Sequence, residues 1–274
     1  MAARAELSIL LIVLAATAHA AGPDWLHPCD YEANPKGCEK VSVNHGVLVA
    51  THLFGFLALA MFSGFFYYYA HRGSGFKNRP FDEIIPRNEF CDIGAIVTGF
   101  AACVYLLRAC HYVREDNGDI NIAKYPYLDY VFTCPLIILD ITYSADIPHK
   151  AFAVVITFAT LLVGCLASQS SDKGERMLLF AMACLICLGL FAHTLYFMQK
   201  NWVNIPKVAQ SSLWWAMFFF FSMWSMFPTF YLLYFEAHAI SFEVWEIVQM
   251  ILDVLAKGVH GVFLTRFRLH MEDI

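Results

Sequence analysis

The chain has 274 residues, of which 59% are hydrophobic and only 15% are charged, and its mean hydropathy is +0.55. Intrinsic disorder is excluded, because disordered chains combine low hydrophobicity with high charge. The net charge of -5 disfavours a nucleic-acid partner. At about 20 residues per membrane helix, a chain of this length holds about seven spans with short loops. The composition therefore predicts an all-α, multi-pass membrane protein.

Residues 1–20 have the features of a signal peptide. Arg4 is a lone basic residue, the stretch from Leu7 to Ala16 is apolar, and residues 18–20 read Ala-His-Ala, which fits the small-x-small pattern of a cleavage site. A short additional membrane helix is the alternative, but the apolar stretch is too short to span a bilayer comfortably. Either interpretation places the following residues outside the cell.

A polar segment follows at residues 21–43 and contains two cysteines. In an oxidising compartment Cys29 and Cys38 could form one disulfide, either within one chain or between protomers. The other cysteines lie in apolar stretches, where a cysteine usually packs as a small hydrophobic residue.

Seven apolar stretches fill the rest of the chain, and we interpret residues 44–270 as one seven-helix domain. An outside N-terminus and seven spans place the C-terminus inside. The first predicted inside loop is the most basic one, as the positive-inside rule requires; it holds Arg72, Lys77, Arg79 and Arg87. The predicted helices cover residues 44–70, 90–112, 125–146, 149–168, 176–199, 211–235 and 240–265.

The seventh predicted helix contains a lysine far from either of its ends. Asp253 precedes Lys257 by one turn and therefore lies on the same helix face. One interpretation is a structural ion pair between helices. The other is a lysine that forms a Schiff base with an aldehyde cofactor. A protonated Schiff base keeps a positive charge and needs a carboxylate counterion.

The third predicted helix carries a polar stripe. Asp129 and Thr133 are one turn apart, and Asp140 lies three turns beyond Asp129 on nearly the same face. The stripe is about 16 Å long at 1.5 Å per residue. Carboxylates inside a membrane helix are typical of a proton or ion route. Polar bonding to neighbouring helices is the alternative, and it is more plausible for the threonine than for two aspartates.

The sixth predicted helix carries aromatic residues on one face. Trp224, Phe227 and Tyr231 are spaced as i, i+3 and i+7. Pro228 is expected to kink this helix. Such a stripe is more often core packing than a cofactor pocket, but beside a buried lysine it would suit a long conjugated ligand.

These three segments together resemble the microbial rhodopsins, seven-helix proteins that hold retinal on a lysine of helix seven. The chain is most similar to the bacteriorhodopsin-like cation channelrhodopsins of protists, a group that includes the potassium-selective kalium channelrhodopsins. The resemblance covers roughly residues 44–270. It implies a multi-pass protein of the plasma membrane, a homotrimeric assembly and ion transport. The motifs that carry it are Asp129 with Thr133 and Asp140, Trp224 with Pro228, and Asp253 with Lys257.

The resemblance also implies a role for each matching position. All-trans retinal would be bound to Lys257 as a protonated Schiff base, with Asp129 and Asp253 as counterions. Thr133 matches a position between the counterion and the cytoplasmic side, and Asp140 matches the proton donor of pumps. The remaining matches are retinal-contacting positions, at Tyr130, Cys134, Pro135, Trp224, Phe227 and Tyr231, and a tyrosine beside the counterion, at Tyr105.

The chain departs from the pattern of outward proton pumps at one position. Such pumps carry an arginine three residues before the first counterion, where this chain has Pro126. The loss of that fixed cation argues against a pump. Arg108, one turn beyond Tyr105, could replace the charge. Alternatively, Arg108 is a helix-end arginine that extends to the lipid headgroups.

The potassium-selective relatives carry a tryptophan where this chain has Pro126 and a tyrosine where it has Glu246, so potassium preference is less expected. Glu246 shares a helix face with Asp253 and Lys257. A carboxylate in an outer vestibule would concentrate cations and favour strongly hydrated ones. The alternative is a solvated residue near the start of the helix.

The expected function is a light-gated channel for monovalent cations, passing sodium and protons. A light-driven outward proton pump is the principal alternative, followed by a photosensor and a ligand-activated receptor. No nucleophile and base pair that would indicate an enzyme stands out. Four histidines within the helices are expected to serve packing or interfaces rather than metal binding, because no ligand spacing links them: His52, His111, His193 and His260.

Overall fold

The computed structural model describes residues 44–71, 87–114, 124–170, 172–237 and 239–272. The predictions for the N-terminal region and for one side chain in the first turn of a helix therefore lie outside what the structure describes. They concern the signal peptide, the segment 21–43 with Cys29 and Cys38, and the side chain of Pro126.

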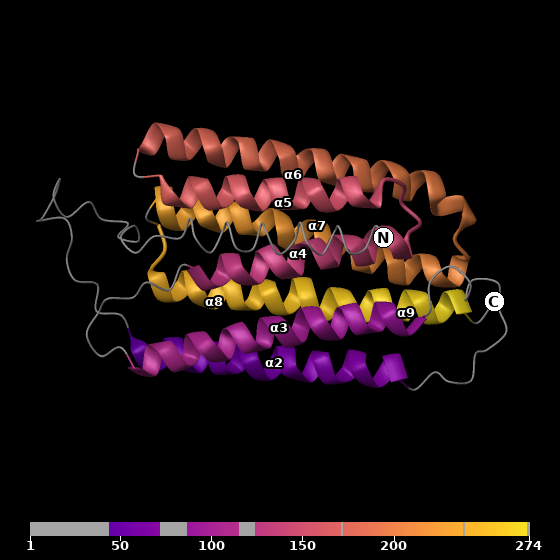
Figure 1. The fold of residues 1–274 in the computed structure, drawn as a ribbon, viewed down its shortest axis with the longest axis horizontal. Helices are drawn as coiled ribbons and strands as arrows, with labels where there is room; N and C mark the ends of the chain where they lie inside the picture. Colours follow the sequence, from indigo (N-terminus) through magenta and orange to yellow (C-terminus); the bar gives the residue numbers. More distant parts are fainter. Residues whose placement is uncertain (1–43, 72–86, 115–123, 171, 238, 273–274) are drawn as a thin grey trace, which may run out of the picture.

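The described residues are helical and include no strand, and their long helices lie nearly parallel in one elongated bundle (Figure 1). Six of the predicted spans correspond to α2 (His45–His71), α3 (Arg87–Arg114), α4 (Lys124–Ser144), α5 (Lys150–Gln169), α6 (Lys173–Asn201) and α7 (Lys207–Tyr231). The seventh span is built from α8 (Phe242–Asp253), the π-helical turn η4 (Val254–Val259) and α9 (His260–Glu272). Short turns η2 (Trp202–Asn204) and η3 (Leu232–Glu236) flank α7.

The seven predicted helices are confirmed, and two of their bounds differ most from the prediction. Helix six begins at Lys207 rather than at 211, because Pro206 directly precedes its first turn. Helix seven continues to Glu272 rather than ending at 265. Its last turns contain several charged and polar residues, so the apolar pattern that predicts a membrane span ends before them. The helix continues because Arg268 bonds to partners on α4.

Six of these helical segments are long and apolar enough to cross a membrane, and α4 is the described long helix that falls short. It carries Asp129 and Asp140 within 21 residues. Both aspartates are buried, and both bond to helix seven. The weak apolar character of α4 therefore follows from its polar contacts inside the bundle.

The helices follow one another around a ring. Each of α2 to α5 packs against the next helix in the chain, α7 packs against α9, and α8 returns to α2. The ring contact between α6 and α7 includes Phe191, which meets Phe220 edge-on. Helix seven thus closes the ring, with its polar residues facing α2, α3 and α4.

Two glycines bring helix seven close to α2. A Cβ on Gly258 would collide with the ring of Phe62, and one on Gly261 would collide with Phe66. Gly258 lies in the π-helical turn that also contains Lys257. A π turn widens the helix by one residue and often occurs at functional sites.

Candidate functional site

The centre of the bundle holds an ammonium group between two carboxylates. Lys257 Nζ lies 2.5 Å from Oδ2 of Asp129 on α4 and 2.9 Å from Oδ1 of Asp253, one turn away on its own helix. All three side chains are buried. The predicted pairing of Asp253 with Lys257 is therefore present, and α4 adds the second carboxylate.

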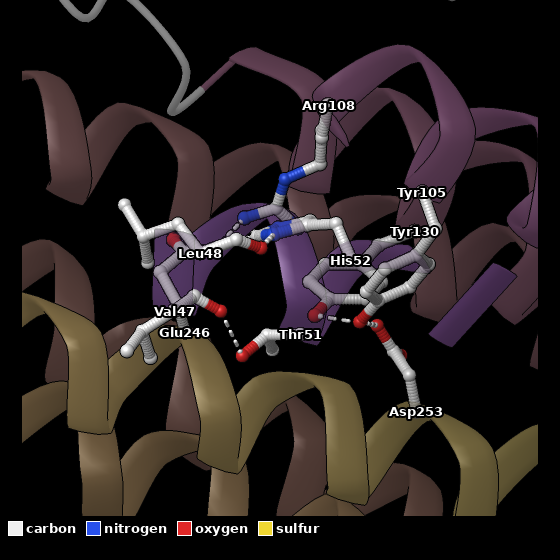
Figure 2. Close-up of polar contacts among 9 residues, drawn as sticks. All are labelled: Val47, Leu48, Thr51, His52, Tyr105, Arg108, Tyr130, Glu246 and Asp253. Carbon is white, nitrogen blue, oxygen red and sulfur yellow. Dashed lines mark hydrogen bonds and ion pairs between the residues drawn. The ribbon is translucent and has the colours of Figure 1, made fainter. Parts of the chain in front are cut away.

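Hydroxyl groups hold both carboxylates in place. Thr133 donates to the backbone oxygen of Asp129 at 2.8 Å and reaches its Oδ1 at 3.3 Å. Figure 2 shows the other side of the centre, where Tyr105 donates to Oδ2 of Asp253 at 2.7 Å and Tyr130 approaches it at 3.4 Å. These donors offset part of the cost of burying two acids beside one cation.

The second aspartate of the α4 stripe, Asp140, forms an ion pair with the end of helix seven. Arg268 donates to Asp140 and also to the hydroxyl of Ser144 at 2.9 Å. The two α4 aspartates and their helix-seven partners are each separated by 11 residues, so the pairs at Lys257 and Arg268 lie about 16 Å apart along the bundle. The predicted polar stripe therefore faces helix seven.

A third set of charged side chains lies toward the start of α8. It consists of Arg108, Glu246 and His52, and we call it the outer cluster. Arg108 is bonded to Glu246, and the side chains are 2% and 4% exposed. His52 Nε2 on α2 lies 3.0 Å from Oε2 of Glu246 (Figure 2). Arg108 thus does not extend to the lipid headgroups, and Glu246 is not a solvated residue.

The predicted aromatic stripe of α7 does not form one continuous surface. Phe227 meets the Tyr130 ring edge-on at 5.4 Å, so it borders the central charges. Trp224 packs against Phe220 at 4.7 Å. Tyr231 instead stacks on Phe180 of α6 at 5.0 Å. Cys134 and Pro135 are buried on α4.

An apolar cluster lies beside the lysine, between α7 and helix seven. Its buried members are Met223, Leu252 and Ala256, the residue that precedes Lys257. Partly buried aromatic side chains of α7 pack against them, namely Phe219, Trp224, Phe227 and Phe230. The ammonium group therefore lies at the junction of a charged region and an apolar, aromatic one.

Two residues of these clusters were not among the site residues predicted from the sequence. Arg268 is one of them, although its 11-residue distance from Lys257 equals that between the α4 aspartates. His52 was assigned to packing, and no local pattern reveals its contact, because its partner is almost 200 residues away in the chain.

The fold and the centre together define a class of protein, namely seven-helix membrane proteins with a buried, carboxylate-paired lysine on the last helix. Residues 48–271 match the family model described as bacteriorhodopsin-like protein. The chain belongs to the bacteriorhodopsin-like family of microbial rhodopsins.

Curated relatives match along most of their length. The chain is 26% identical to the bacteriorhodopsin of Haloterrigena sp. (strain arg-4) over 215 residues, which cover 76% of this chain and 84% of that protein. It is 24% identical to archaerhodopsin-1 of Halorubrum ezzemoulense over 229 residues, which cover 80% and 84% of the two chains.

Solved structures share the fold at low sequence identity. The light-driven proton pump LR (Mac) of Leptosphaeria maculans has a TM-score of 0.69 and 20% identity, with 82% of this chain and 96% of that chain covered. Thermophilic rhodopsin of Rubrobacter xylanophilus has a TM-score of 0.70 and 20% identity, with 82% and 98% covered. At this identity the likeness shows the seven-helix fold and not the direction or mode of transport.

Proposed function

We propose that this protein is a light-gated cation channel of the channelrhodopsin group, with retinal on Lys257 as a protonated Schiff base. When bound there, retinal would supply light absorption and a change of shape on illumination. Passive conduction of sodium and protons would follow. The observation that carries the choice of a channel is the ion pair between Asp140 and Arg268.

The residues around Lys257 fit an aldehyde with a long apolar tail. The primary amine is the group that condenses with an aldehyde, and Asp129 and Asp253 balance one positive charge at that nitrogen. The apolar cluster beside Ala256 offers a dry, aromatic surface of the kind that ligand pockets use. The positions proposed to contact retinal are Tyr130, Thr133, Cys134, Pro135, Trp224, Phe227 and Tyr231.

The inner ion pair favours a channel over a pump. A pump needs at the position of Asp140 a protonated carboxyl group that can give up its proton. Here the group contacts a guanidinium, which stabilises the ionised form of a carboxyl group. Asp140 with Arg268 is then better suited to closing the inner half of a cation route than to storing a proton.

Charge pairs close the route at three levels in this arrangement. The outer cluster, the Lys257 centre and the Asp140–Arg268 pair all involve helix seven. The first two are buried, and in the third Asp140 is buried and Arg268 is partly buried. A proton shift from Lys257 to Asp129 or Asp253 would neutralise both partners and so remove their ion pair at the middle level. Water could then hydrate the separated groups, and cations could pass along carboxylates that no longer bind their basic partners.

A light-driven outward proton pump is the second candidate. Two observations favour it: the carboxylates of α4 have the spacing expected of a proton acceptor and donor, and the solved neighbour from Leptosphaeria maculans is described as a proton pump. In that case Arg108 would supply the fixed outer cation that Pro126 does not provide.

The proposal also includes location and assembly. The protein would lie in the plasma membrane, with its N-terminus outside and its C-terminus inside, because the first inside loop is the most basic one. Homotrimeric assembly rests on the resemblance alone. Monovalent cations and membrane lipids are the expected partners, and an enzymatic activity is not expected.

Voltage clamp of retinal-supplied cells tests the proposal while sodium, potassium and external pH are exchanged. A channel gives light-induced currents whose reversal potential follows the ion gradients, and the shifts rank the ions. A current that remains outward at all voltages would overturn the channel in favour of the pump. Light absorption without any current would point to a sensor.

A further inference from the structure

We infer that His52 is a proton-binding site in the outer half of the bundle, and that it is held as a doubly protonated imidazolium by the contacts around it. The inference goes beyond the proposed function, since it concerns the protonation of a residue outside the retinal centre. It rests on the geometry of the two ring nitrogens, which face two different oxygen atoms (Figure 2).

The first nitrogen has to carry a proton. His52 Nδ1 lies 2.7 Å from the backbone oxygen of Leu48, one turn earlier on α2. A carbonyl oxygen can only accept a hydrogen bond. An unprotonated Nδ1 would therefore direct its lone pair at another lone pair at this short distance. The neutral tautomer with its proton on Nε2 alone is thus disfavoured.

The second nitrogen faces a carboxylate. Nε2 lies 3.0 Å from Oε2 of Glu246, off the axis of an aligned hydrogen bond but at ion-pair distance. The same oxygen accepts from the guanidinium of Arg108, which favours the ionised form of Glu246. A neutral His52 ring with its proton on Nδ1 would direct the Nε2 lone pair at this carboxylate. A second proton on Nε2 replaces that repulsion with attraction to Glu246.

Two neighbouring aromatic rings favour the charged ring as well. The centroid of His52 lies 5.6 Å from that of Tyr105 and 5.0 Å from that of Tyr112, both on α3. The faces of aromatic rings attract cations. His52 is fully buried and has no contact with solvent. The two tyrosine rings and Glu246 therefore have to stabilise the positive charge that water would otherwise stabilise.

The other titratable groups around the cluster come from every element packed against it. Arg108, Tyr105 and Tyr112 belong to α3, Tyr130 to α4, Tyr234 to η3, and Glu246 and Asp253 to α8. Arg108 is the fixed cation among them and the tyrosines are neutral, so the protonation of His52 sets the net charge of the cluster.

The bound proton determines the net charge of the outer cluster. With the proton, two cations face one carboxylate; without it, Arg108 and Glu246 neutralise each other. An excess positive charge at the outer end of a cation route repels incoming cations. The bound proton would thus hinder cation entry, and its loss at raised external pH would favour entry. This consequence depends on the proposed channel, whereas the protonation state of His52 does not.

Nitrogen-15 NMR of the histidine-labelled, retinal-bound protein in lipid nanodiscs tests the proton-binding site directly. His52→Gln, or His52→Asn if the first variant does not fold, identifies the signals of this ring by their loss. Both ring nitrogens are expected to be protonated at neutral pH. A neutral ring with its proton on Nδ1 alone would overturn the inference, whatever the protein transports.

Photocurrents at different external pH values test the consequence. The sodium current is expected to rise as the external pH is raised above neutral, because His52 then loses its proton, and His52→Gln is expected to lose this dependence. His193→Gln is the matched control, because this half-buried histidine on α6 packs with His149 and Phe197 instead. An unchanged pH dependence in His52→Gln would refute the proposed effect on entry. Absence of current in the wild-type protein would instead refute the channel.

Discussion

Buried charges in this protein are balanced locally. Lys257 has two carboxylates, Asp140 has Arg268, and Glu246 has both Arg108 and His52. Removing one partner of such a pair leaves an uncompensated charge away from water, which costs far more than the pair contributes. Single substitutions at these positions are therefore expected to lower the free energy of unfolding strongly. Substituting both partners of a pair is expected to lower it less.

Lys257→Ala is expected to abolish both visible absorbance and photocurrent, because the amine that would carry retinal is lost. Absorption spectra of the purified protein with added retinal measure this directly. Lys173→Ala, at the exposed start of α6, is the control that should keep its colour. A coloured and photoactive Lys257→Ala variant would contradict the retinal assignment.

Glu246→Gln should destabilise the protein by about 3–5 kcal/mol, because Arg108 and His52 lose their shared carboxylate. Thermal unfolding in lipid or detergent measures the loss. The double variant with Arg108→Gln should recover part of the stability, since the orphaned guanidinium is also removed. Equal stability of wild type and Glu246→Gln would contradict the buried pairing.

The same variant tests the place of Glu246 in the ion route. If the carboxylate lines the route, Glu246→Gln should lower cation conductance or change the relative permeabilities, because a negative charge that attracts cations is lost. Unchanged current amplitudes and reversal potentials would show that Glu246 lies outside the pore.

The packing of α2 against helix seven depends on two glycines rather than on apolar burial, because lipid offers the helices an equally apolar environment. Gly258 and Gly261 have no room for a Cβ beside Phe62 and Phe66. The spans themselves were predictable from composition, and all seven were located. The role of these glycines was not predictable, because it depends on which side chains of the neighbouring helix lie against them.

Gly258→Ala is expected to lower the free energy of unfolding by about 1–3 kcal/mol, the usual cost of overpacking. It should also shift the absorption band, because Lys257 is adjacent in the same π turn. Gly189→Ala is the matched control: a Cβ there meets open space, and alanine favours the helix by up to about 1 kcal/mol. Thermal unfolding and absorption spectra compare the two, and equal behaviour would contradict the close packing.

Across the bundle, helix seven connects the three charged levels, so closure of the proposed route depends on all of them. The Asp140–Arg268 level is the simplest to open without disturbing the Lys257 centre, because Arg268 and Lys257 are 11 residues apart. The partner of Arg268 is Asp140 on α4. Breaking this pair therefore separates α4 from helix seven at one end only.

Arg268→Gln is therefore expected to increase the current in the dark or to slow its decay after light, because one closing pair is lost. Arg266→Gln is the matched control, since Arg266 is exposed and bonds to His270 on its own helix. Whole-cell recording in darkness and after a light pulse measures both effects. If the two variants behave alike, the inner ion pair does not close the route.

Composition and helical spacing alone were sufficient for the seven spans, the shared face of Asp129 and Asp140, and the pairing of Asp253 with Lys257. Such features repeat at fixed intervals along one helix, so local geometry sets them. The contacts of Arg108, Arg268 and His52 depended on the tertiary structure. Each of these side chains bonds to a different helix, and helical periodicity carries no information about which helices become neighbours or how deeply a charged residue is buried between them.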